Sequence, residues 1–137
     1  MRRIDKLVVH HTASQDTNDL DVANIRRFHT ENNRWSDIGY HFLIDKINGT
    51  YEAIVGRPIH RQGAHVRGHN RNSVGIAVVG NFETEHPEDE MYDVLIGRVV
   101  IPLHHLFPKA KIYAHNELAA TKCPGSNFDI NRIKAAL

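Results

Sequence analysis

The sequence predicts one α/β domain over residues 1–137, with a central mixed β-sheet of about five strands packed by about three helices. Three observations lead to this fold class. Short β-branched runs alternate with segments of helical periodicity. Two strand-like runs flank Asn48-Gly49, a strong signal for an antiparallel hairpin, whereas helical crossovers favour parallel neighbours. Finally, 137 residues suffice for one hydrophobic core and are too few for two ordinary ones.

The first half of the chain is expected to form a strand, a helix and the hairpin. Residues 6–10 (KLVVH) are a β-branched run typical of a buried strand. Asn18 or Asp19 can cap a helix that ends near Asn32-Asn33. The apolar stripe of that helix consists of Val22, Ile25 and Phe28. The hairpin strands are expected at 39–45 and 50–55.

The second half is expected to alternate between loop, strand and helix. Residues 56–73 lack any period and predict a loop, and the apolar run 74–79 predicts a central strand. Pro87 suits the first turn of a long helix, which Pro102 should kink or end. The stripe of that helix is Met91, Leu95, Val99 and Leu103. A last strand at 111–114 and a closing helix at 128–137, with Ile130, Ile133 and Leu137 inward, complete the fold.

The composition excludes several classes of protein. Seventeen Lys and Arg residues against sixteen Asp and Glu leave a formal charge of +1, which argues against a nucleic-acid partner. The single cysteine, Cys123, forbids an intrachain disulfide. The longest apolar stretch, 94–103, is interrupted by Arg98, and the N-terminus has no apolar signal segment. We therefore expect a protein made in the cytoplasm, with no membrane insertion.

Candidate metal ligands stand at the predicted strand ends. His10 and His11 close the first strand, His115 follows the last, and Cys123 comes shortly after it. Two imidazoles and a thiolate would leave one position of a tetrahedral zinc site open for water, whose pKa the metal lowers to about 7. The spacing alone leaves alternatives open: Cys123 can be a small buried side chain without a ligand role, and the paired histidines can be ordinary surface residues.

Five motifs occur in an order that resembles a known family. They are VVHHTAS at 8–14, GYHF at 39–42, GAH at 63–65, NSVGI at 72–76, and HNE at 115–117 followed by TKCPG at 121–125. Together they resemble the zinc-dependent N-acetylmuramoyl-L-alanine amidases, which include small phage lysozymes, or endolysins, and peptidoglycan recognition proteins. The resemblance extends over residues 6–137 and implies a mixed sheet packed by helices.

The resemblance also implies the site residues. The family's metal ligands fall on His10, His115 and Cys123, with one zinc ion per chain. Successive residues of a strand point to opposite faces, so His11 is expected to have a structural role, as is His41. The family's catalytic tyrosine falls on Tyr40, whose phenol can hydrogen-bond the attacking hydroxide or the oxyanion.

Two further groups follow from the same resemblance. Thr121 occupies a catalytic position that is Lys in some members of the family, and the neighbouring Lys122 is expected to be solvated. His65, Asn70 and Asn72 fall in the loop that borders the family's substrate groove, where they are expected to contact a peptide stem or glycan.

The expected function is hydrolysis of the amide bond between N-acetylmuramic acid and L-alanine of peptidoglycan by a monomeric zinc amidase. The lack of a signal peptide and of an added wall-binding domain favours a phage-type endolysin that reaches the cell wall after release, ahead of a bacterial wall-recycling enzyme. Two alternatives stay open. One is a recognition module that binds peptidoglycan without cutting it, and the other is a hydrolase with Cys123 as nucleophile and His115 as base.

Overall fold

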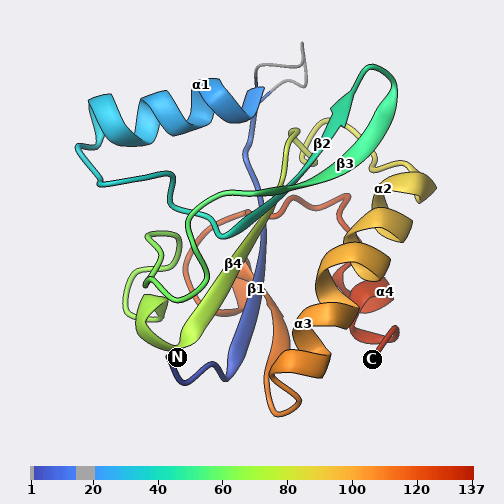
Figure 1. The fold of residues 1–137 in the computed structure, drawn as a ribbon. Helices are drawn as coiled ribbons and strands as arrows, with labels where there is room; N and C mark the ends of the chain where they lie inside the picture. Colours follow the sequence, from blue (N-terminus) through green and yellow to red (C-terminus); the bar gives the residue numbers. More distant parts are fainter. Residues whose placement is uncertain (1, 15–20) are drawn as a thin grey trace.

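A five-stranded mixed sheet in the order β3-β2-β4-β1-β5 forms the centre of the molecule (Figure 1). The structure, a computed structural model, describes residues 2–14 and 21–137. Its strands are β1 (Lys6–His11), β2 (Phe42–Ile47), β3 (Thr50–Val55), β4 (Ser73–Val78) and β5 (Lys111–Ala114). Strand β1 pairs in parallel with β4 and β5, and β2 with β4, whereas β3 is antiparallel to β2. The predicted mixed sheet is confirmed.

The hairpin forms at the predicted turn. Asn48 and Gly49 have φ angles of 51° and 80°, the left-handed conformation that a tight two-residue hairpin turn requires. Strand β2 begins at Phe42, later than the predicted 39. Before it, the backbone instead pairs with loop residues: the Arg57 N–H donates to Tyr40 O at 2.8 Å, and the Ala64 N–H donates to Gly39 O at 3.0 Å.

Helices cover both faces of the sheet (Figure 1). One face carries α2 (Asp89–Val94), the π-helical η3 (Leu95–Val100), α3 (Ile101–Leu106) and the short α4 (Ile130–Lys134). Met91, Leu95, Val99 and Leu103 are all buried in the larger hydrophobic cluster there, as their spacing predicted. The other face carries α1 (Asp21–Arg27), continued by the π-helical η1 (Phe28–Asn32). Its Val22 and Ile25 pack on a smaller cluster.

Several element boundaries differ from the sequence-based expectations. The long helix begins at Asp89, after Pro87, and Pro102 does not end it. The turn before Pro102 is wider, with the Ile101 N–H donating to Ile96 O, and this π-helical spacing accommodates a residue that has no N–H. Phe28 is 54% exposed because His29, seven residues after Val22, takes the inward position of the stripe, where its Nδ1 accepts a hydrogen bond from the Gly39 N–H at 2.9 Å. Leu137 is 44% exposed because α4 ends at Lys134.

Two further expectations concerned the cap of the first helix and insertion into a membrane. The expected helix cap at Asn18 or Asp19 lies outside the described residues. In the part of the chain that the structure describes, every helix is too short or too polar to span a bilayer.

The parallel strands bring their carboxyl ends to one edge of the sheet. The register places His10 beside Ala77 of β4 and Val9 beside Ala114 of β5. Because His115 directly follows Ala114, it lies next to His10. Strands β1 and β5 thus position two histidines, far apart in the sequence, side by side.

Candidate metal centre

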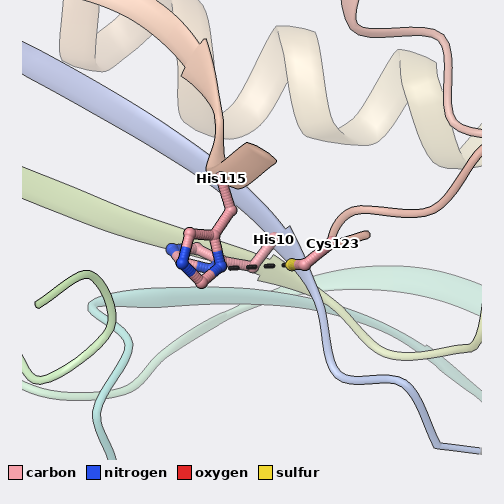
Figure 2. Close-up of side chains that lie close together, drawn as sticks. All are labelled: His10, His115 and Cys123. Carbon is pink, nitrogen blue, oxygen red and sulfur yellow. Dashed lines mark hydrogen bonds between the residues drawn. The ribbon is translucent and has the colours of Figure 1, made fainter. Parts of the chain in front are cut away.

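Three side chains predicted as metal ligands converge at this edge. Nδ1 of His10 lies 3.1 Å from Nδ1 of His115 and 3.8 Å from Sγ of Cys123. The three ligand atoms, one from each residue, all lie within 4.8 Å of one another. Figure 2 shows both imidazole rings turned toward the cysteine sulfur from separate strand ends.

Backbone hydrogen bonds hold Cys123 at the end of β5. The Asn116 N–H donates to the Cys123 carbonyl at 2.9 Å, and the His11 N–H donates to Sγ at 3.3 Å. Burial raises the pKa of the Cys123 thiol to about 11, and the His11 N–H offsets this only in part. A nucleophilic cysteine needs a lowered pKa, so this environment disfavours the cysteine-hydrolase alternative.

The donor set and its spacing fit zinc. A tetrahedral zinc ion separates two nitrogen ligands by about 3.4 Å, and a nitrogen and a sulfur ligand by about 3.6 Å. The two spacings of 3.1 Å and 3.8 Å at His10 are close to these values. Two imidazoles and one thiolate form a ligand set that suits zinc better than magnesium or calcium.

The electrostatic surroundings keep the imidazoles neutral. Burial lowers the pKa of His10 well below its ordinary value, and the nearby His65, His115 and His11 lower it further. Burial likewise lowers the pKa of His115. A neutral imidazole offers the lone pair that metal coordination requires.

The three residues lie at one side of a cavity of about 400 Å³ that also contains both predicted catalytic residues. Tyr40 lines it, with its ring centroid 5.2 Å from that of His10. Burial, followed by the charge of Cys123, raises the pKa of Tyr40 to about 12, so its hydroxyl stays protonated and can donate. Thr121 lies exposed at the rim, where its Oγ1 accepts a hydrogen bond from the Cys123 N–H at 3.3 Å.

The three residues predicted to contact substrate lie in different places. His65 lines the cavity. Asn70 supports the loop, because its Oδ1 accepts hydrogen bonds from the N–H groups of His65 and Val66, both at 2.9 Å. Asn72 lies at the opposite edge of the sheet, where its Nδ2 donates to Asp5 at 3.0 Å and it lines a separate cavity with Arg2 and Arg3. The structure therefore brings only His65 of these three to the candidate centre.

The two histidines expected to have structural roles have ring nitrogens that contact the main chain. Nδ1 of His11 accepts a hydrogen bond from the Phe82 N–H at 3.1 Å. Nδ1 of His41 accepts from the Gly75 N–H at 3.0 Å, and its Nε2 donates to the Arg61 carbonyl at 2.7 Å. Hydrogen bonds to backbone groups occupy nitrogens that a metal ligand would need.

Sequence reasoning missed two residues of the cavity wall, Asn81 and Glu83. They follow the carboxyl end of β4, in the same position relative to the sheet as His10 and His115. Side chains just after parallel strands gather at one edge, so this position was the signal that could have identified them.

Comparisons with known proteins agree with this geometry. The model of one protein family, described as N-acetylmuramoyl-L-alanine amidase, matches residues 1–126. An endolysin of Enterobacteria phage K11 is 38% identical over 128 residues, covering 90% of this chain and 81% of the endolysin. An endolysin of Escherichia phage T7 is 33% identical, covering 93% of this chain and 83% of that protein.

Solved structures show the same similarity in three dimensions. N-acetylmuramoyl-L-alanine amidase LysC from Clostridium intestinale URNW superimposes with a TM-score of 0.85 at 31% identity, covering 98% of this chain and 85% of LysC. Bumblebee PGRP-SA superimposes with a TM-score of 0.81 at 31% identity, covering 93% of this chain and 79% of that protein.

Proposed function

The chain belongs to the N-acetylmuramoyl-L-alanine amidase family and is a peptidoglycan amidase of the phage endolysin type, and from that premise we propose that it works with one zinc ion held by His10, His115 and Cys123. The observation that carries the proposal is the convergence of these three ligand atoms within 4.8 Å at the wall of a cavity. The bond cleaved joins the lactyl group of N-acetylmuramic acid to L-alanine.

The chain's own side chains supply the rest of the proposed mechanism. A zinc ion bound at such a site supplies Lewis-acid polarisation and lowers the pKa of water. Tyr40 keeps a phenolic donor in the cavity, where it stabilises the negative charge that develops on the scissile carbonyl oxygen. Thr121 adds a second, uncharged hydroxyl at the rim. His10 and His115 contribute neutral ring nitrogens as ligands.

The alternatives left open by the sequence are less well supported. A module that only binds peptidoglycan has no need for a nitrogen-and-sulfur ligand set beside a phenol, yet this chain has both. A cysteine hydrolase needs a reactive thiolate, and burial opposes ionisation of Cys123. Zinc hydrolysis accounts for the ligand set beside a phenol and also for the buried thiol, because a thiol that coordinates a metal ion loses its proton.

The proposal includes the partner and the organisation of the chain. Peptidoglycan is the substrate. The expected contacts of its stem peptide or glycan to His65, Asn70 and Asn72 stay a prediction, and only His65 of the three lines the cavity. We further propose that residues 1–137 act as a single amidase domain and as a monomer, without a nucleic-acid partner. Residence in the cytoplasm until the inner membrane is breached stays a prediction, and the site of action is the cell wall.

Digestion of purified peptidoglycan tests the function directly. Mass analysis of the products should show free stem peptides with new L-alanine amino termini while the glycan strands stay intact. Cys123→Ser serves as the inactive control. New reducing sugar ends without new amino termini would show that another bond is cut.

A further inference from the structure

A chain of hydrogen bonds runs from the candidate metal centre into the sheet. Nε2 of His10 lies 2.9 Å from Nδ1 of His65, and Nε2 of His65 lies 3.2 Å from Oγ of Ser73. His10 and Ser73 are both buried, with exposed fractions of 1% and 0%. His65 therefore connects a proposed ligand to the first residue of β4.

The ligand geometry determines the direction of these hydrogen bonds. Nδ1 of His10 faces His115 and Cys123, so a neutral His10 that coordinates through Nδ1 carries its proton on Nε2. That Nε2–H can only donate, and Nδ1 of His65 is the acceptor within reach. A neutral His65 then carries its own proton on Nε2 and donates to Ser73. Each ring nitrogen of His10 and His65 therefore has one consistent role in this series of hydrogen bonds.

Local packing holds the His65 ring in place. A Cβ atom at Gly75 would lie 2.6 Å from Cδ2 and Cγ of His65, so the strand leaves out a side chain where the ring rests. A Cβ atom at Gly63 would lie 2.9 Å from Cδ2 of the same ring. The backbone of His65 is held as well, because its N–H donates to Asn70 Oδ1 at 2.9 Å. The ring has little freedom to leave its acceptor position.

We propose that His65 is a positioning residue of the metal centre, which holds the His10 ring so that Nδ1 faces the metal. The inference deepens the proposed function and rests on it, because it requires a metal at His10. Partners that accept a hydrogen bond from a ligating imidazole orient the ring, and their loss typically weakens metal binding about 10- to 100-fold. His65 also lines the cavity, so direct substrate contact is the competing explanation.

Two similar variants separate these roles. His65→Asn keeps an acceptor oxygen near the position of Nδ1, whereas His65→Gln moves its polar end toward the position of Nε2 and away from His10. His60→Gln, in the same loop and exposed, is the matched control. The dissociation constant for zinc is measured for each full-length protein by competition with a chromophoric chelator, together with the visible spectrum of bound cobalt.

Zinc affinity should fall about 10- to 100-fold in His65→Gln, with a changed cobalt spectrum, and stay within about threefold of wild type in His65→Asn and His60→Gln. Equal zinc affinity in all four proteins, with a raised KM for peptidoglycan in the two His65 variants, would overturn the inference and make His65 a substrate contact. Equal losses in His65→Asn and His65→Gln would overturn it too, because the acceptor would not matter. Absence of stoichiometric zinc from the wild type would instead overturn the proposed function itself.

Discussion

Two pairs of histidines in the same small domain differ in what their ring nitrogens contact. In the ligand pair, His10 and His115, each Nδ1 faces the other at 3.1 Å. In the anchor pair, His11 and His41, each Nδ1 accepts a hydrogen bond from a backbone N–H, at 3.1 Å and 3.0 Å. Burial lowers the pKa of all four residues. Burial and pKa therefore do not distinguish a metal ligand from a structural histidine, whereas the partner of each nitrogen does.

His10 and His11 make this contrast within two adjacent residues. They alternate across β1, and the ring of His11 lies near Phe82, in the larger hydrophobic cluster. The ring of His10 lies among Tyr40, His65 and His115 on the cavity side. A shift of one residue in the register of β1 would exchange the two environments.

The largest effect on zinc binding and activity should follow the loss of Cys123, the third proposed ligand, which faces the ligand pair. Cys123→Ser replaces a thiolate by a hydroxyl that does not ionise near neutral pH, so zinc should fall from about one per chain to near zero by elemental analysis. Amidase activity should fall at least about 10³-fold, because a catalytic metal contributes several kcal/mol. His41→Asn, in the anchor pair, should keep its zinc. Full zinc content in Cys123→Ser would mean that Cys123 is not a zinc ligand, and the contrast between the ligand pair and the anchor pair would no longer hold.

The next largest effect concerns the phenol beside the ligand pair. Tyr40→Phe keeps the ring that packs 5.2 Å from His10 and removes only the hydroxyl donor. Loss of one donor to a developing oxyanion typically lowers turnover about 10²–10³-fold. Zinc content, thermal stability and affinity for peptidoglycan should stay near wild type, and kcat should carry the loss. A wild-type kcat with zinc fully bound would mean that Tyr40 only packs against the centre.

The anchor pair should contribute to the free energy of unfolding, and this contribution should depend on pH. Burial lowers the pKa of His41 from its ordinary 6.5 to about 4. The unfolded chain then takes up this proton first, so the stability that neutral His41 contributes is present above pH 6.5 and is lost as the pH falls toward 4. The full loss is about 3 kcal/mol, and about 2 kcal/mol of it is gone by pH 5. The structural cause is visible, because a proton on Nδ1 would displace the Gly75 N–H.

Urea unfolding of wild type and His41→Asn from pH 8 to pH 5 measures this contribution. The asparagine retains an acceptor for the Gly75 N–H but does not titrate, and the other buried histidines titrate in both proteins. The difference in the free energy of unfolding should therefore change by about 2 kcal/mol in the variant's favour between pH 8 and pH 5. A difference that stays constant with pH would mean that His41 is not held neutral by the fold.

Much of this fold could be predicted from local patterns. The apolar, β-branched runs at 6–10 and 74–79 are typical of buried strands. Asn48-Gly49 favours a hairpin because both residues tolerate the positive φ angles of a tight turn. The convergence of His10, His115 and Cys123 was also predictable, because parallel strands end at one edge and the motifs resemble a known family.

Other features depend on geometry that no local pattern encodes. The contact of His65 with His10 depends on how an aperiodic loop returns over β4, and on Gly75 leaving room for a ring. Asn72, by contrast, lies just before the strand predicted at 74–79, so its place at the far edge could have been recognised from the sequence. The π-helical spacing before Pro102, which lets the long helix continue, has no signal in the apolar stripe.

The smallest predicted effect concerns Thr121, at the exposed rim of the same centre. Its Oγ1 accepts the Cys123 N–H at 3.3 Å, which leaves the hydroxyl hydrogen available to donate into the cavity. An alcohol is a weaker donor than a phenol, and one neutral hydrogen bond contributes about 0.5–1.5 kcal/mol, so Thr121→Val should lower kcat about 3- to 10-fold. Thr121→Ser, which keeps the hydroxyl, should stay near wild type, and both variants should retain zinc by elemental analysis. A loss of zinc in Thr121→Val that matches its loss of activity would instead mean that Thr121 acts by holding the Cys123 backbone, and Tyr40 would then be the sole side-chain donor proposed to act on the substrate.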